Sequence, residues 1–146
     1  MVITVKNNTN SRIIFKKIKL TVAKFIDYFY SRKLNINKKY NKSNLEVSIV
    51  FVGAGLMKKL NSRYRRINKA TDVLSFSGDN NFIGEILINY ARIKIQAKKY
   101  KHTLNQELVF ILIHGLLHLL GYDDKTTKGR QKMEKISNDF LKYSRI

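Results

Sequence analysis

The sequence contains no cysteine. This absence excludes disulfide bonds, thiolate metal sites and cysteine nucleophiles, so no disulfide partner is expected. Proline is absent as well, whereas lysine, asparagine and isoleucine, whose codons are rich in A and T, are abundant. The excess of lysine therefore has two candidate causes, genome composition and selection for an anionic partner.

Acidic residues are scarce. Aspartate and glutamate total 10 against 29 lysines and arginines, which gives a formal net charge of +19. A charge of this size does not determine a fold, but it favours polyanionic partners. Among such partners the charge favours nucleic acid first and an anionic membrane surface second.

No apolar run is long enough to span a bilayer. The longest, residues 108–120, is 13 residues long and is interrupted by two histidines and a glycine, whereas a membrane-spanning helix needs about 20 apolar residues. The first residues show neither an apolar core nor a cleavage site typical of a secretory signal. We therefore expect a soluble, cytoplasmic protein without a membrane partner, in which residues 108–120 form a buried helix.

The remaining composition indicates one folded domain. A chain of 146 residues with 44% hydrophobic residues can bury a single core, so residues 1–146 are taken as one domain. Residues 33–44 are polar and predict a loop, and Gly53 and Gly55 are expected to end the strand before them. Hydrophobic periodicity predicts strands at residues 2–5, 45–52, 71–76 and 83–88, and helices at residues 14–30, 56–64, 90–100, 103–120 and 128–143.

The helix predicted at residues 103–120 has clear start and stop signals. Thr103 followed by Gln106 is typical of a capping box, and Gly121 is suited to end the helix in a left-handed conformation. By analogy with zinc hydrolases, the strand at residues 83–88 is expected at the sheet edge beside the active-site cleft.

Two histidines on that helix suggest a metal site. His114 and His118 are four residues apart, so their imidazoles lie on one helix face, one turn apart. A chain reversal at Gly121 would bring Asp124, or alternatively Asp123, back toward them. Two nitrogens and one oxygen with a fourth position open are typical of a catalytic zinc site.

Two observations limit this interpretation. Zinc peptidases place a glutamate after the first histidine as general base, but Gly115 occupies that position, which argues against peptide hydrolysis. A histidine pair on an apolar helix can also be purely structural, but here two of only three histidines lie in the most apolar stretch. The third, His102, is interpreted as an ordinary surface residue.

Three sequence blocks resemble the YbeY endoribonucleases, which are bacterial rRNA maturation factors. Residues 114–124, His-Gly-Leu-Leu-His-Leu-Leu-Gly-Tyr-Asp-Asp, resemble that family's metal-binding signature, His-Gly-x-Leu-His-Leu-x-Gly-Tyr-Asp-His. Residues 60–65 and 71–76 resemble its Leu-Asn-x-x-Tyr-Arg and Thr-Asp-Val-Leu-Ser-Phe segments, and residues 83–88 resemble its strand containing Gly-Asp. The blocks occur in the family's order.

The resemblance implies a fold and an activity. The fold would be α+β, of the zinc-hydrolase (zincin-like) type, with a single small mixed sheet of about four strands packed by helices. The activity would be that of a zinc-dependent, single-strand-specific endoribonuclease in 16S rRNA 3′-end maturation and ribosome quality control, with rRNA and the small ribosomal subunit as partners. His114, His118 and Asp124 would bind one Zn²⁺ ion, and Arg65 would match the family's functionally important arginine.

Asp124 is a departure from the family pattern, which has a third histidine there. A carboxylate oxygen can bind zinc, but it cancels one unit of the ion's charge whereas a histidine cancels none. We therefore expect a weaker Lewis acid than in a three-histidine site. Asp123 stays a rival ligand, and its other role would be a hydrogen bond that caps the loop.

The segment around Arg65 is strongly basic. Residues 58–69 hold six cations and no acid, and Tyr64 among them could stack on a base. This segment is either a solvated face or a groove that follows an RNA backbone, and Arg65 would clamp a phosphate there. Six cations near the C-terminus are interpreted as solvated surface or ribosome contact, namely Lys128, Arg130, Lys132, Lys135, Lys142 and Arg145.

Two alternatives to the endoribonuclease stay open. One is another zinc hydrolase, against which Gly115 counts. The other is a ribosome-associated RNA-binding protein whose catalysis is weakened by the exchange at Asp124.

Overall fold

A single mixed sheet forms the centre of the molecule. The computed structural model describes residues 1–34 and 40–146. In these residues the strands are β1 (Val2–Asn7), β2 (Glu46–Val52), β3 (Val73–Ser77) and β4 (Phe82–Asn89). Their order in the sheet is β1-β2-β4-β3; β1, β2 and β4 run parallel, and β3 pairs antiparallel with β4. The small mixed sheet predicted from the sequence is confirmed.

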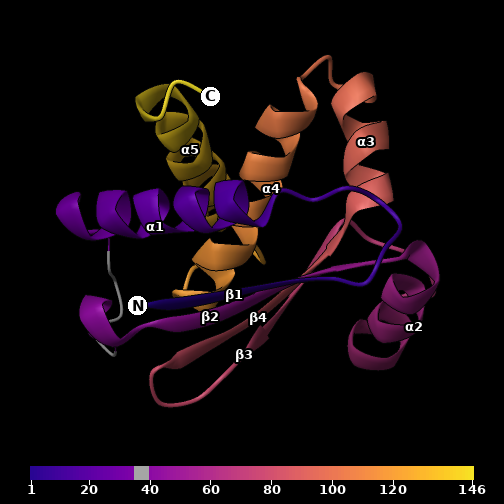
Figure 1. Cartoon of the computed structure of the whole chain (residues 1–146), viewed down its shortest axis with the longest axis horizontal. Helices are drawn as coiled ribbons and strands as arrows, with labels where there is room; N and C mark the ends of the chain where they lie inside the picture. The colour runs from indigo at the N-terminus through magenta and orange to yellow at the C-terminus, as the bar shows by residue number, and fades with distance from the viewer. Residues whose placement is uncertain (35–39) are drawn as a thin grey trace.

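Helices cover both faces of this sheet, unequally (Figure 1). The helices are α1 (Phe15–Ser31), α2 (Ala54–Arg65), α3 (Tyr90–Lys99), α4 (Leu104–Leu119) and α5 (Thr127–Tyr143), with a short 3₁₀ turn, η1 (Lys42–Asn44). The larger core joins α1, α4 and α5 to one sheet face. A smaller cluster around Met57 of α2 lies on the other face. None of the helices in the described ranges is both long and apolar enough to cross a bilayer.

The position of β4 corrects one prediction. Residues 83–88 were expected at the sheet edge, but β4 lies between β2 and β3, and β3 is the edge strand. The reason is burial on both faces: Ile86 and Ile88 belong to the larger core, and Leu87 belongs to the smaller cluster. Such a continuous apolar run is typical of an interior strand.

The predicted boundaries are correct within a few residues, with one exception. Gly53 is the N-cap residue of α2 and Gly55 lies inside that helix, so Gly55 does not act as a break. Of the loop predicted at residues 33–44, residues 35–39 lie outside the described residues, and residues 42–44 form η1.

The helix that carries both histidines is fixed at its start and along its length. Thr103 Oγ1 accepts from the N–H of Gln106 at 3.1 Å, and Gln106 Oε1 accepts from the N–H of Thr103 at 3.0 Å, so the predicted capping box is confirmed. Gly115 lets α4 approach the sheet closely, because a Cβ there would lie 2.9 Å from Ile86 Cγ2. Ser75 of β3 donates a hydrogen bond to the Gly115 carbonyl at 3.2 Å.

Candidate metal centre

The two histidines of α4 face each other near its C-terminal end. Their ring centroids are 4.8 Å apart, and the two Nε2 atoms are 3.1 Å apart. Both side chains are partly buried, with 26% and 29% of their surface exposed. The four-residue spacing therefore places both imidazoles on one face, as the sequence predicts.

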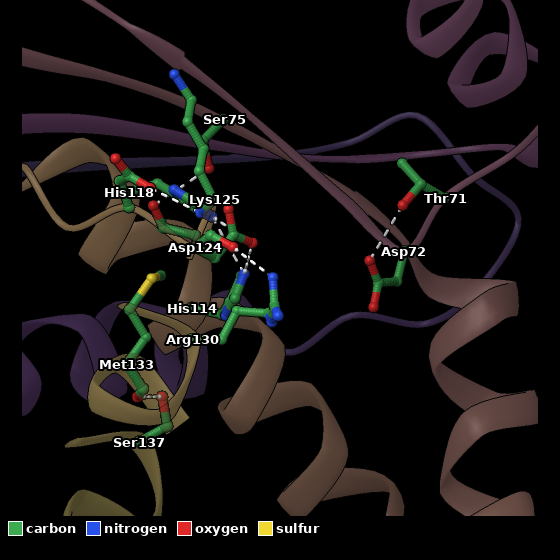
Figure 2. Close-up of polar contacts among 12 residues, drawn as sticks. Thr71, Asp72, Ser75, His114, His118, Asp124, Lys125, Arg130, Met133 and Ser137 are labelled. Carbon is green, nitrogen blue, oxygen red and sulfur yellow. Dashed lines mark hydrogen bonds and ion pairs between the residues drawn. The ribbon is translucent and has the colours of Figure 1, made fainter. Parts of the chain in front are cut away.

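The turn after α4 brings an aspartate to the same point. Gly121 has φ +104°, and its N–H donates to the carbonyl of His118 at 3.2 Å. The N–H of Tyr122 donates to the carbonyl of Leu117 at 2.9 Å, which completes a Schellman-type ending of the helix. After this reversal, Asp124 Oδ2 lies 3.4 Å from Nε2 of each histidine. Figure 2 shows the three side chains converging.

Only one of the two neighbouring aspartates joins this cluster. Asp123 Oδ1 accepts a hydrogen bond from the N–H of Lys125 at 2.7 Å, which is the loop-capping role considered for it. Among the described residues, His114, His118 and Asp124 are the group whose ligand atoms lie close enough to hold a metal ion. The structure thus places Asp124, rather than Asp123, beside the histidines.

The spacing of the three ligand atoms fits a zinc ion. Ligands of tetrahedral zinc at about 2.0–2.1 Å from the ion lie about 3.3 Å from one another. The observed distances are 3.1 Å between the two nitrogens and 3.4 Å from each nitrogen to the carboxylate oxygen. Two imidazoles and one carboxylate with a fourth position open also match the donor set of catalytic zinc sites.

The surroundings of His114 favour its neutral form. Burial lowers its pKa below 6.5, and the neighbouring His118 lowers it further. The carboxylates of Asp124 and Asp72 act in the opposite direction and are weaker causes. A neutral imidazole is the form that binds a metal ion, so the His114 environment favours ligation.

A cavity of about 700 Å³ opens beside the three ligands, and we call it the central cavity. Arg65, at the end of α2, lines this cavity together with the cluster, so it can reach a group bound beside the three ligands. Other polar residues in its wall are Thr71, Asp72, Ser75, Ser77 and Lys125. In Figure 2, Thr71 and Asp72 lie apart from the histidines, whereas Ser75 and Lys125 lie beside them.

Two residues interpreted as plain surface have defined contacts. Arg130 of α5 donates to the Asp124 carbonyl at 3.2 Å and to Thr127 Oγ1 at 3.1 Å, so it supports the loop that carries Asp124. His102 is exposed, as predicted for a surface residue, but its Nδ1 also lies 3.0 Å from Oε2 of the buried Glu107. The only sequence signal for either contact was a polar residue close to the apolar helix.

Tyr64 is held against the sheet. Its ring packs edge-on against Phe76 of β3 at 5.2 Å between centroids, and the Arg63 guanidinium lies 5.6 Å from the Tyr64 ring. Even so, 59% of Tyr64 is exposed, so the ring keeps a free surface on which a base could stack.

Comparison with known proteins identifies the family to which this chain is similar. The sequence profile of the family described as Endoribonuclease YbeY matches residues 4–145. The chain belongs to the YbeY family. An Endoribonuclease YbeY of Thermodesulfovibrio yellowstonii is 40% identical over 140 residues, which cover 89% of this chain and 88% of that protein. An Endoribonuclease YbeY of Mycoplasma mobile is 32% identical over 149 residues, which cover 96% and 92%.

The fold of this YbeY-family chain also matches a solved structure. The solution structure of TM1509 from Thermotoga maritima superimposes with a TM-score of 0.61 over 99% of this chain and 92% of that one, at 23% sequence identity. This likeness concerns the fold alone. Membership of the YbeY family supports an endoribonuclease function, and the cluster of His114, His118 and Asp124 is compatible with a bound metal ion.

Proposed function

We propose that this protein is a zinc-dependent endoribonuclease that cleaves single-stranded RNA. One observation carries the proposal: three ligand atoms spaced at 3.1–3.4 Å, as tetrahedral zinc requires, border a cavity that an arginine also lines. The relatives named Endoribonuclease YbeY give RNA as the substrate class. The net charge of +19 favours such a polyanion.

The proposed roles follow from the chemistry of each side chain. His114, His118 and Asp124 would hold one Zn²⁺ ion, which would supply a Lewis acid for the phosphodiester. Arg65 would bind the scissile phosphate through its planar fork and stabilise the negative charge that develops there. Arg130 would keep the Asp124 loop in place through the carbonyl contact.

A peptidase function has little support from this site. A zinc peptidase of the related kind needs a glutamate at position 115 as general base. Gly115 instead faces Ile86 and Ser75, so a longer side chain at that position would collide with the sheet. The missing glutamate is therefore part of how α4 packs.

The biological substrate is also part of the proposal. We propose 16S rRNA 3′-end maturation and ribosome quality control, with the small ribosomal subunit as partner and the cytoplasm as the place of action. Residues 1–146 would act as one metal-dependent hydrolase domain. The support is membership of the YbeY family, whose sequence profile covers residues 4–145.

Cleavage assays test this function. The purified protein should cleave a single-stranded RNA that carries the 16S 3′ precursor sequence, and should cleave the same sequence in a duplex at least about ten times more slowly, a difference of about 1.4 kcal/mol in activation free energy. Equal cleavage of both forms would contradict single-strand specificity. Cleavage of a peptide library would instead favour another zinc hydrolase.

A second candidate function rests on Asp124. Because its carboxylate cancels one unit of a zinc ion's charge, the chain could bind RNA without efficient cleavage. The Asp124→His variant separates the two candidates. If the unaltered protein binds RNA without cleaving it and Asp124→His restores cleavage, the protein is a weakened, RNA-binding member of the family.

A further inference from the structure

A second cavity adjoins the central cavity, and we call it the flanking cavity. It has a volume of about 290 Å³ and lies between the end of α2, the loop at residues 66–72 and the start of α3. Its polar lining consists mainly of Asn61, Arg65, Lys69, Thr71, Asp72 and Arg92. Three of these, Arg65, Thr71 and Asp72, also line the central cavity, so the two cavities share a wall.

Two buried asparagines hold the walls of the flanking cavity. Asn61 Nδ2 donates to the Lys69 carbonyl at 2.8 Å, and Asn89 Nδ2 donates to the Thr71 carbonyl at 3.2 Å. Both asparagines are only 2% exposed. Asn89 Oδ1 also accepts from the N–H of Arg92 at 3.3 Å, which caps α3. The backbone around this cavity is therefore fixed before any ligand arrives.

Positive charge exceeds negative charge in the lining of the flanking cavity. Arg65, Lys69 and Arg92 come from three different segments, and none of them forms an ion pair with any residue that the structure describes. Asp72 is the one carboxylate in the lining. Three cations around one concave surface favour an anion, and the fork of arginine suits a phosphate.

One buried acceptor beside the cavity also lacks a partner within the described part of the chain. Asn61 Oδ1 accepts no hydrogen bond there, and Asn61 is only 2% exposed. The amide cannot simply be reversed, because its nitrogen is needed for the Lys69 carbonyl. A buried acceptor without a donor is costly, so a group that brings an O–H or N–H would be stabilised there.

We propose that the flanking cavity binds the ribonucleotide next to the scissile linkage. Arg92 and Lys69 hold its phosphate, and its ribose 2′-hydroxyl displaces the side chains that cover Asn61 Oδ1 and donates to that atom. Arg65 lies on the shared wall and so contacts both this phosphate and the scissile one. The inference rests on the proposed endoribonuclease function. It explains how a sequence-independent enzyme could select RNA, because the 2′-hydroxyl is what distinguishes RNA from DNA.

Neutralising single phosphates tests the contact with Arg92. Zinc-loaded protein is given a single-stranded RNA in which one linkage at a time is an uncharged methylphosphonate, and product lengths show which linkage is cut. We expect cleavage one linkage away from the substitution, on one side only, to fall about 5- to 10-fold. In the Arg92→Gln variant the same substitution should change cleavage less than about 2-fold, because the contact is already lost.

A control variant and three outcomes make this test decisive. Lys98→Gln removes another exposed charge from α3, outside the cavity lining, and it should keep the pattern of the unaltered protein. If the decreases in cleavage caused by Arg92→Gln and by the methylphosphonate simply add at every position, the inference is overturned while the proposed function stays intact. Absence of any cleavage by the unaltered, zinc-loaded protein would overturn both.

Single deoxynucleotides test the contact with Asn61 without altering the protein. One 2′-deoxy residue is placed at each position of the same RNA, and cleavage of the neighbouring linkages is measured. We expect a decrease of about 3- to 10-fold on the same side and at the same distance as for the methylphosphonate. Unchanged cleavage of all neighbouring linkages would show that Asn61 Oδ1 does not accept from a ribose, and would overturn that part of the inference.

Discussion

At the scale of single residues, two adjacent aspartates have different roles. Asp124 Oδ2 lies 3.4 Å from Nε2 of both His114 and His118, whereas Asp123 caps the loop through the N–H of Lys125. The sequence left both as candidate ligands. The Schellman-type turn at Gly121 decides between them, because it fixes which side chain faces the histidines.

The two aspartates should differ in their effect on zinc affinity. Asp124→Ala removes one of three ligands and should weaken zinc binding at least about 100-fold, since losing even a partner of a ligand costs 10- to 100-fold. Asp123→Ala should weaken it less than about 10-fold. Competition with a chromophoric chelator measures both values. An equal loss in the two variants would contradict the placement of the ligands.

The lowered pKa of His114 gives a prediction for the stability of the metal-free protein. Its pKa in the folded state lies below the unfolded value of 6.5, mainly because of burial. Above pH 6.5 both states are neutral at this residue and the full stability is present. As the pH falls from 6.5 through the folded pKa, the unfolded state takes up the proton first, so the free energy of unfolding decreases.

Denaturant unfolding in the presence of a chelator, at several pH values between 5 and 8, measures this effect. We expect the decrease below pH 6.5 to become smaller in His114→Gln, which has no imidazole at this position. An unchanged pH dependence in His114→Gln would contradict the assignment to His114.

At the scale of elements, the approach of α4 to the sheet is the feature that positions the cluster. A Cβ at Gly115 would lie 2.9 Å from Ile86 Cγ2 and 3.3 Å from Ser75 Oγ. Both histidines are on this helix, one of them adjacent to Gly115. Moving α4 away from β3 and β4 would therefore also move the metal ligands relative to Arg65.

Alanine substitutions at two helical glycines test this packing. Gly115→Ala should lower the free energy of unfolding by about 1–3 kcal/mol through overpacking, and should also reduce RNA cleavage. Gly55→Ala in α2 is the matched control, because its Cβ would meet nothing within 4 Å. That variant should be neutral or more stable by up to about 1 kcal/mol. If thermal unfolding gives the same free energy of unfolding for both variants, α4 does not depend on Gly115 for its close approach to the sheet.

The elements also show how far the sequence alone could go. Three features depend on contacts within a few residues along the chain, so sequence patterns predicted them. They are the capping box at Thr103, the helix end at Gly121 and the facing pair of His114 and His118. The place of β4 depends on which strands pair, and an apolar run reads the same at the edge and in the interior when no partner is known.

Contacts between distant elements were also beyond the sequence. Arg130 supports Asp124 only because α5 folds back along the loop after α4, and its charge resembled that of the other surface cations. His102 contacts Glu107 across the start of α4, where a buried carboxylate was not expected. Arg92 has no sequence motif, and its place beside Lys69 follows from the packing of α3 against the 66–72 loop.

At the scale of the whole molecule, the cations behind the charge of +19 can act on RNA in two ways, and the salt dependence of binding separates them. Cations that contact phosphates release counterions, whereas scattered surface lysines act only through a screened field. If the two proposed phosphates are contacted, the logarithm of the RNA affinity should fall with the logarithm of salt concentration with a slope of about −1.4, since single strands give about −0.7 per contact.

Paired charge removal locates the phosphate contacts. The double variant Lys69→Gln with Arg92→Gln should reduce the magnitude of this slope by about 0.7, because these two side chains hold one of the two phosphates. The control, Lys16→Gln with Lys19→Gln, removes two exposed cations from α1 and should reduce it by less than about 0.3. Fluorescence anisotropy with a labelled single-stranded RNA, in chelator to prevent cleavage, provides the values. Equal changes in both variants would show that the charge acts without a defined groove.

RNA cleavage should depend on a zinc ion that His114, His118 and Asp124 hold. The most direct measurement removes metal with a chelator, adds zinc back in steps and records both bound zinc and cleavage of a single-stranded RNA, with His114→Ala prepared in parallel. Cleavage should rise with bound zinc up to one ion per chain and should be absent in His114→Ala. Cleavage that persists without metal, or equally in His114→Ala, would contradict it.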